Sequence, residues 1–174
     1  VGGRRDYIEA DLGVALLKAH IVEHTVAAMD ATHLALRLPF RDHQSFLAAR
    51  GQGCLVFTAT VEQATLTAAA LRNGGWKAAH ISGETPSGER DHLLRSFERG
   101  ELDVLCNAVV LTEGTDLPRA SVIVIARPTK SWSLYVQMLG RALRPFGEQE
   151  RALVLDLVGA TDLHSIIAAP VLVD

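Results

Sequence analysis

Runs of apolar residues recur along the C-terminal two thirds of the chain and alternate with amphipathic stretches. The apolar runs cover residues 54–58, 77–81, 103–106, 122–126 and 152–157. Several of them lack the apolar–polar alternation of a half-exposed strand, which indicates strands that are buried on both faces. Because helical stretches separate most of these runs, the pattern predicts a doubly wound α/β fold with a mainly parallel sheet and flanking helices.

Polar residues mark where the helices between the strands begin. Thr60 is the expected N-cap of the helix after the first strand, and Gln63, three residues later, would complete a capping box. Thr85 is the expected N-cap of the next helix, in which Pro86 would occupy the first helical position. A third helix is expected over residues 131–143.

Residues 1–50 follow a different pattern. Apolar residues recur there at roughly helical spacing from Leu12 to Met29, which predicts a helical segment. We therefore divide the chain into a helical connector or accessory segment, residues 1–50, and an α/β domain, residues 51–174. Because the chain opens at Val1 without an initiator methionine, we interpret it as a part of a longer protein.

Composition and charge narrow the class of protein. Hydrophobic residues make up 48% of the chain and charged residues 21%, as is typical of a soluble globular domain. The net charge is −3, so any contact with nucleic acid must be local. No apolar run reaches the ~18 residues that span a bilayer, and no signal peptide is present, so we expect a cytoplasmic, intracellular protein without a membrane partner. Cys54 and Cys106 lie in apolar runs, which predicts buried free thiols in a reducing compartment.

One candidate site lies on the predicted third helix, in the run QMLGRALRP of residues 137–145. Gln137, Arg141 and Arg144 fall at positions i, i+4 and i+7, so they share one face of a helix. Two guanidinium groups and an amide on one face suit a polyphosphate whose charge must be stabilised. A solvated basic helix end would use the same residues, because arginines there are favoured by the helix dipole.

A second candidate site lies in the run CNAVVLTEGTDLP of residues 106–118. The run follows a buried strand and so lies at the carboxyl edge of the sheet, where ligands bind in folds of this kind. Gly114 permits a tight turn, and Asp116 lies close to the rigid Pro118. An ordinary strand-end turn would also be rich in Gly, Asp and Pro.

Two shorter runs, LVFTAT at residues 55–60 and SGETP at residues 82–86, complete a set of four segments. In their order, these segments resemble motifs of the C-terminal RecA-like domain of superfamily 2 (DEAD/DEAH-like) helicases, over about residues 53–158. The run with the two arginines resembles motif VI, in which both reach the γ-phosphate of ATP held by the other domain. The resemblance implies that Arg144 is an arginine finger, that Arg141 lies beside it, and that Gln137 lies near the phosphate or the attacking water.

The run LTEGTDLP resembles motif V, and LVFTAT resembles motif IV. The resemblance implies that Gly114 and Asp116 contact the nucleotide and the inter-domain interface, and that strand-end residues contact the nucleic-acid backbone. The spacing ahead of Gly114 is longer than in DEAD-box members, which favours the DEAH-like or DNA-translocating branches. The candidates for contact with nucleic-acid phosphates are Thr58, Ser82, Gly83, Asn107 and Thr112.

The resemblance implies the C-terminal half of an ATP-dependent helicase or translocase that acts on DNA, or alternatively on RNA. The sequence contains no G-x-x-x-x-G-K-[ST] phosphate loop and no Asp-Glu box. ATP and Mg²⁺ would therefore be held mainly by an N-terminal RecA-like domain of the same protein, and the isolated chain would be inactive.

Three alternatives remain open at this point. The chain could belong to a restriction or remodelling translocase that does not separate strands, or it could be a non-catalytic nucleic-acid- or protein-binding module. A zinc hydrolase is the third alternative, because His20 and His24 lie in an H-x-x-E-H pattern. No third ligand follows this pattern, so we predict no metal site. Trp132 could stack on a base, whereas Trp76 is expected to pack in the core.

Overall fold

The structure, a computed structural model, describes residues 15, 20–35, 53–108, 117–129, 131–142 and 153–159. Of residues 31–35, 141 and 142, only the backbone is described. None of the helices in these ranges is long and apolar enough to cross a bilayer.

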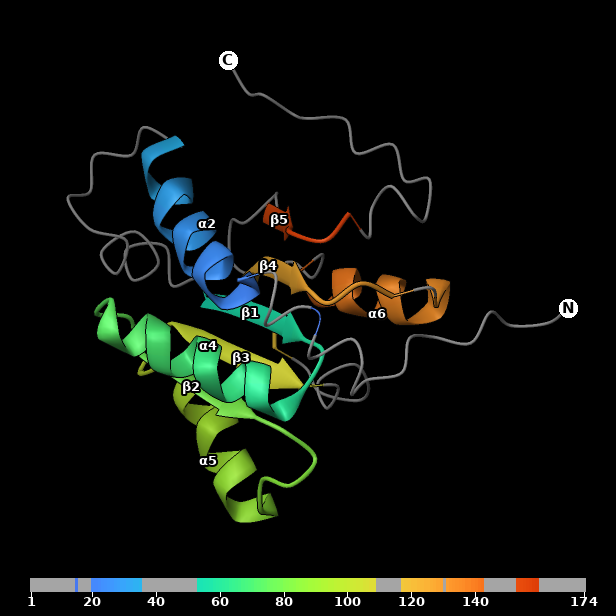
Figure 1. Ribbon diagram of the computed structural model, residues 1–174. Coiled ribbons are helices and arrows are strands. Elements are labelled where there is room, and N and C mark those ends of the chain that lie inside the picture. The colour runs from blue at the N-terminus through green and yellow to red at the C-terminus, as the bar shows by residue number, and fades with distance from the viewer. Residues whose placement is uncertain are drawn as a thin grey trace, which may run out of the picture.

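The described residues form a five-stranded sheet in which every pair of neighbouring strands is parallel (Figure 1). The strand order is β2-β3-β1-β4-β5. The strands are β1 (Gly53–Thr58), β2 (Ala78–Ile81), β3 (Val104–Ala108), β4 (Ala120–Ala126) and β5 (Leu153–Asp156). These bounds follow the five apolar runs of the sequence, and the prediction of a doubly wound parallel sheet is confirmed.

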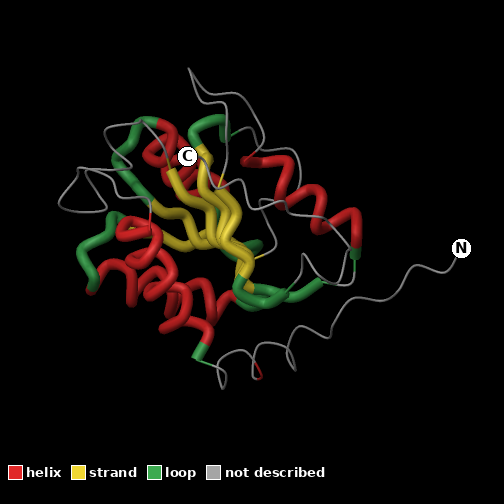
Figure 2. The backbone as a smooth tube through the Cα atoms, turned by 90° about the horizontal axis from the view of Figure 1, so that it is seen from above, coloured by secondary structure: helices red, strands yellow, loops and turns green. Residues whose placement is uncertain are grey.

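Helices cover both faces of the sheet, as the view from above shows (Figure 2). Helices α2 (Ile21–Ala35) and α4 (Val61–Asn73) pack on one face. Helices α5 (Ser87–Glu98) and α6 (Trp132–Ala142) contribute to the hydrophobic cluster of the opposite face. The third predicted helix, over residues 131–143, corresponds to α6 and is confirmed.

Successive residues of the central strands belong to two separate hydrophobic clusters, one on each face of the sheet, because side chains in a strand alternate between its faces. In β1, Cys54 and Val56 face the cluster with α4, whereas Leu55 and Phe57 face the cluster with α6. All four are buried. The apolar runs are continuous because both faces of these strands are covered.

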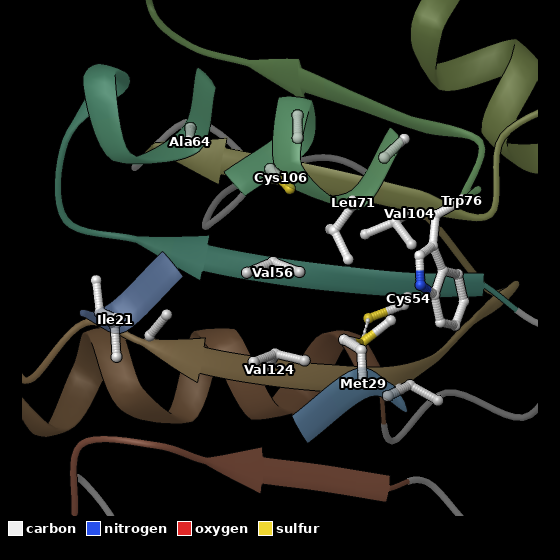
Figure 3. Close-up of a cluster of buried hydrophobic side chains, with 14 of the residues drawn as sticks. Ile21, Met29, Cys54, Val56, Ala64, Leu71, Trp76, Val104, Cys106 and Val124 are labelled. Atoms are coloured by element: carbon white, nitrogen blue, oxygen red, sulfur yellow. Dashed lines mark hydrogen bonds between the residues drawn. The ribbon is translucent and has the colours of Figure 1, made fainter. Parts of the chain in front are cut away.

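Helix α2 shares the core of the sheet (Figure 3). Its residues Ile21 and Met29 are buried in the same cluster as Leu71 and Trp76. The Trp76 indole N–H donates to the Asp30 carboxylate over 3.4 Å, so Trp76 packs in the core as expected. The helical prediction for the N-terminal region is confirmed over α2, and the rest of residues 1–19 and 36–50, apart from residue 15, lies outside the described residues. The domain boundary at residue 50 stays a prediction.

The expected cap of α4 is present. The Thr60 hydroxyl accepts a hydrogen bond from the Gln63 backbone N–H over 3.1 Å. The Gln63 side-chain oxygen accepts from the Ala59 N–H over 2.9 Å, one residue earlier than in a standard capping box. The pair closes the turn between β1 and α4.

The prediction that Thr85 caps α5 is wrong. The helix begins at Ser87, and its N-cap is Pro86, which makes no side-chain capping bond. The Thr85 hydroxyl instead accepts from the Ser82 backbone N–H over 3.0 Å. The hydroxyl is therefore used by the turn ahead of the helix and not by the helix itself.

Both cysteines are free and fully buried, which confirms the prediction of buried thiols. Burial raises the pKa of Cys106 to about 12 and raises the pKa of Cys54 well above its ordinary value. The Cys54 thiol lies 3.6 Å from the Met29 sulfur. Since the thiolate is the reactive form, burial of both thiols disfavours nucleophilic chemistry at either residue.

A buried arginine joins elements at the amino edge of the sheet, and the sequence patterns did not indicate it. The Arg119 guanidinium donates to the carbonyls of Phe97 and Leu102, each over 2.7 Å. It also lies 5.2 Å from the centroid of the Phe97 ring. A Cβ atom at Gly53 would lie 2.5 Å from this ring, so only glycine fits there. Burial lowers the pKa of Arg119, and the nearby carboxylate of Asp103 acts in the opposite direction.

Candidate functional site

The carboxyl ends of the parallel strands meet at one edge of the sheet, which is where ligands bind in doubly wound folds. Strands β1 and β3 end side by side, with Thr58 in register with Ala108. Strand β4 ends beside β1, with Ala126 in register with Thr58. The candidate residues that follow these strands are therefore brought to a common edge.

Thr58 and Asn107 lie together on the two central strands, and both are fully buried. The Thr58 hydroxyl lies 3.1 Å from the Asn107 carbonyl oxygen and 3.2 Å from the Thr60 carbonyl oxygen. In this conformation neither side chain is open to a phosphate, and the threonine links the ends of β1 and β3. Their roles as phosphate contacts stay predictions.

Ser82 follows β2 and begins a tight turn. The Thr85 N–H donates to the Ser82 carbonyl over 3.2 Å, and the Glu84 N–H donates to the Ser82 hydroxyl over 3.2 Å. Ser82 is buried, whereas Gly83 is exposed. A Cβ atom at Gly83 would meet nothing within 4 Å. Of the four predicted phosphate-binding residues that the structure describes, Gly83 is the one whose backbone faces open space.

Helix α6 carries the described part of the motif VI resemblance. Tyr135 and Met138 are fully buried against the sheet and fix the helix there. Gln137 is partly buried, and position 141 follows it by one helical turn. The structure therefore confirms a helix at Gln137 and Arg141, and the Arg141 side chain lies outside what the structure describes. Arg144, Thr112, Gly114 and Asp116 lie outside the described residues, and their roles stay predictions.

Three buried polar residues near the carboxyl edge were not indicated as site residues by the sequence. The Gln63 side-chain N–H donates to the Ala126 carbonyl over 3.0 Å, so it ties the start of α4 to the end of β4. Arg127 and Thr129 directly follow β4, and both are buried. The Thr129 hydroxyl accepts from the Ser131 N–H over 3.1 Å, just ahead of α6. Their position directly after a buried strand was the available signal for the last two.

The histidines of the H-x-x-E-H pattern are exposed at the start of α2. His20 Nδ1 lies 3.6 Å from a Glu23 carboxylate oxygen, an exposed pair that contributes little to stability. Across the described ranges, no three His, Cys, Asp or Glu side chains gather as metal ligands would. Trp132 is 53% exposed at the start of α6, with its ring centroid 6.2 Å from that of Tyr135.

The fold and the edge of the sheet define the class of protein. Residues 39–145, more than half of the chain, match the helicase conserved C-terminal domain family. The chain belongs to this family, which confirms its recognition as a superfamily 2 helicase C-terminal domain.

Individual relatives agree with this family. The chain is 36% identical over 102 residues to a Saccharomyces cerevisiae protein named "Putative ATP-dependent helicase IRC3", covering 59% of this chain and 15% of that protein. It is 32% identical over 108 residues to the UvrABC system protein B of Helicobacter pylori, covering 59% and 16%. The chain thus spans less than a fifth of the length of these two curated relatives.

Solved structures show the same RecA-like fold. Dbp5 of Saccharomyces cerevisiae, in a structure bound to RNA and ADP BeF3, superposes with a TM-score of 0.57 at 21% identity, covering 70% of this chain and 33% of that one. The Hef helicase domain of Pyrococcus furiosus superposes with a TM-score of 0.51 at 26% identity, covering 74% and 24%.

Proposed function

We propose that this chain is the second RecA-like half of an ATP-dependent nucleic-acid helicase or translocase. ATP would bind with Mg²⁺ in the cleft between this domain and an N-terminal RecA-like domain. Closure of the cleft would bring Arg144 and Arg141 to the γ-phosphate, with Gln137 near the phosphate or the attacking water. Stabilising the charge that develops on the phosphate is the main task of the protein in such reactions.

The observation that carries this proposal is the placement of α6. The helix follows β4 at the carboxyl edge of the sheet, and its apolar face is anchored by Tyr135 and Met138. Gln137 lies off that anchored face by helical geometry, and the sequence places Arg141 one turn further along the helix. A rigid helix at a ligand-binding edge is a suitable support for groups that must meet a phosphate in one orientation.

The proposed grip on nucleic acid is local and independent of sequence. A chain with a net charge of −3 offers no broad basic field, and contacts with phosphates carry no sequence information. We expect the nucleic acid to be DNA and not RNA, because the long spacing ahead of Gly114 resembles the DEAH-like or DNA-translocating branches more than DEAD-box members. A strand-displacement assay on the full-length protein would distinguish a helicase from a translocase that leaves the duplex intact.

We expect the isolated chain to hydrolyse no measurable ATP, with or without nucleic acid. The sequence has no phosphate loop to cradle the β- and γ-phosphates and no Asp-Glu box for Mg²⁺. Steady-state phosphate release by the purified chain is the measurement. Robust turnover that falls on Arg144→Ala would contradict the division of labour between two domains.

In the full-length protein, we expect Asp116→Ala to reduce nucleic-acid-stimulated ATP hydrolysis while the melting temperature stays unchanged. The reason is its proposed place between the nucleotide and the domain interface. Glu101→Ala is the matched control, because Glu101 is an exposed carboxylate just ahead of β3, at the amino edge of the sheet and opposite to the candidate site. Unchanged stimulation would remove Asp116 from the site, and a large loss of stability would instead indicate a purely structural turn.

A further inference from the structure

Helix α6 carries an exposed apolar pair that the proposed ATP chemistry does not use. Trp132 is 53% exposed and Val136 is 44% exposed. The two residues are four positions apart, so their side chains are neighbours on one face of the helix. The connection after β4 runs beyond the carboxyl ends of the strands before α6 begins at Trp132 (Figure 1). The indole therefore stands past the edge of the sheet at which the candidate site lies.

The backbone beneath this indole is held by hydrogen bonds on both sides. The Thr129 hydroxyl accepts from the Ser131 N–H over 3.1 Å, and the Ser131 hydroxyl accepts from the Leu134 N–H over 3.3 Å. Tyr135 is 1% exposed, and its ring lies beside the indole with the two planes inclined by 32°. An aromatic side chain that is already held in place loses little conformational freedom when a flat ligand stacks on it.

We propose that Trp132 is a stacking residue for an unpaired base of the nucleic-acid strand. Every base has a π face, so stacking on an aromatic side chain adds affinity without selecting a sequence. A chain with a net charge of −3 can make few phosphate contacts, and a stacked base would add affinity that does not depend on charge. The inference rests on the proposed function, because it assumes that a strand crosses this edge of the sheet.

The position of Trp132 on α6 favours a base of the strand over the adenine of ATP. Nine residues separate Trp132 from position 141, which corresponds to about two and a half helical turns and about 13 Å along the axis. The two positions therefore lie on opposite sides and at opposite ends of the helix. If Arg141 meets the γ-phosphate, the indole is directed elsewhere.

The size of the apolar pair favours a base over a protein partner. A stable protein interface takes about 800 Å² from each partner, and its centre is a broad apolar area. In the described part of the chain, Trp132 and Val136 are the exposed large apolar side chains of α6. One indole with a valine beside it matches the area of a single base much better than that of a protein surface.

The experiment compares two single-stranded ligands of equal length and equal phosphate number. One is labelled oligo(dA), and the other is a labelled deoxyribose-phosphate strand without bases. Fluorescence anisotropy measures their binding to the full-length protein and to Trp132→Leu and Trp132→Phe over a range of salt concentrations. Leucine keeps an apolar side chain without a π face, whereas phenylalanine keeps an aromatic ring. Leu66→Ala is the matched control, because Leu66 is 44% exposed on α4, which covers the other face of the sheet.

We expect Trp132→Leu to weaken the binding of oligo(dA) about tenfold, as loss of one stacked base would. Trp132→Phe should recover most of this loss. The strand without bases should bind equally well to all variants. The slope of log affinity against log salt should not change, since stacking releases no counterions. Oligo(dA) should also quench a part of the tryptophan emission that Trp132→Phe lacks, and Leu66→Ala should match the wild type throughout.

Four results would overturn the inference. Equal losses for both strands in Trp132→Leu would show that the indole acts through the fold and not on a base. No recovery in Trp132→Phe would exclude stacking as the contact. Wild-type affinity of Trp132→Leu for oligo(dA) would leave the indole without a role in strand binding, and a raised KM for ATP in that variant would assign it to the adenine. These three results leave the proposed function intact, whereas failure of the wild-type protein to bind either strand would refute the proposed function as well.

Discussion

Replacing Arg144 by alanine in the full-length protein should lower kcat for ATP hydrolysis by about 10²-fold or more. Arginine fingers contribute on the order of 10³–10⁵ in rate in related phosphoryl-transfer enzymes, and a helicase need not reach the upper end. Because the group would act on charge that develops only in the transition state, KM for ATP should change less than kcat. Steady-state hydrolysis by wild type and variant, paired with thermal melting, is the measurement.

Arg144→Lys supplies the control for charge. Lysine keeps the positive charge but lacks the planar fork of the guanidinium, so it should not restore the rate. Arg141→Ala should also be severe, with a larger effect on KM if Arg141 touches the phosphate in the ground state. Near wild-type turnover by Arg144→Ala would exclude it as an arginine finger and would favour the non-catalytic binding module.

Replacing Arg119 by methionine should lower the free energy of unfolding by about 2–4 kcal/mol. The substitution keeps the aliphatic stem but removes the donor that now serves the carbonyls of Phe97 and Leu102. The Phe97 carbonyl keeps a bond from the Gly100 N–H over 3.0 Å, so most of the loss is expected at Leu102. A buried acceptor that loses its partner costs about 1–3 kcal/mol. The melting temperature should therefore fall by roughly 5–15 °C for a domain of this size.

Arg95→Met is the control, because it removes an exposed arginine of α5 with little expected change in stability. Thermal unfolding followed by circular dichroism would compare the two variants at one protein concentration. A melting temperature of Arg119→Met within about 2 °C of wild type would show that water replaces the guanidinium at both carbonyls.

The strands could be predicted because burial on both faces requires a run of consecutive apolar residues, which is visible in the sequence itself. Each strand of the central sheet must be apolar at consecutive positions, as at Leu55 and Val56, which enter opposite clusters. The cap of α4 was also local, since Thr60 and Gln63 lie three residues apart. Such features involve only neighbours along the chain.

Features that depend on distant partners could not be predicted. Arg119 bonds to carbonyls 22 and 17 residues away, and Gln63 reaches Ala126 across the sheet. The cap at Thr85 was predicted wrongly because a strand-end turn competed for the same hydroxyl. Nothing in the spacing of α2 indicated that Ile21 and Met29 complete the core beside Trp76.

The sequence predicted at which edge of the sheet the candidate site lies, but not which of its side chains are exposed. Motif order placed Thr58, Asn107 and Gly83 at one edge of the sheet, and parallel pairing of β1, β3 and β2 confirms that edge. A motif does not state which of its residues are exposed, however, and two of these three are fully buried. The contacts of Arg90 with the backbone carbonyls of Ser82, Gly83 and Thr85 could not be predicted, because every residue has a backbone carbonyl.

The two tryptophans of this chain occupy opposite environments, which gives the domain two separate optical signals. Trp76 is enclosed beneath α2, so its emission should be blue-shifted and shielded from iodide until that helix leaves the sheet. Trp132 stands 53% exposed at the start of α6, so iodide should quench it in the native state. Selective quenching can therefore follow events at the proposed ATP-facing helix without interference from the fluorophore in the core.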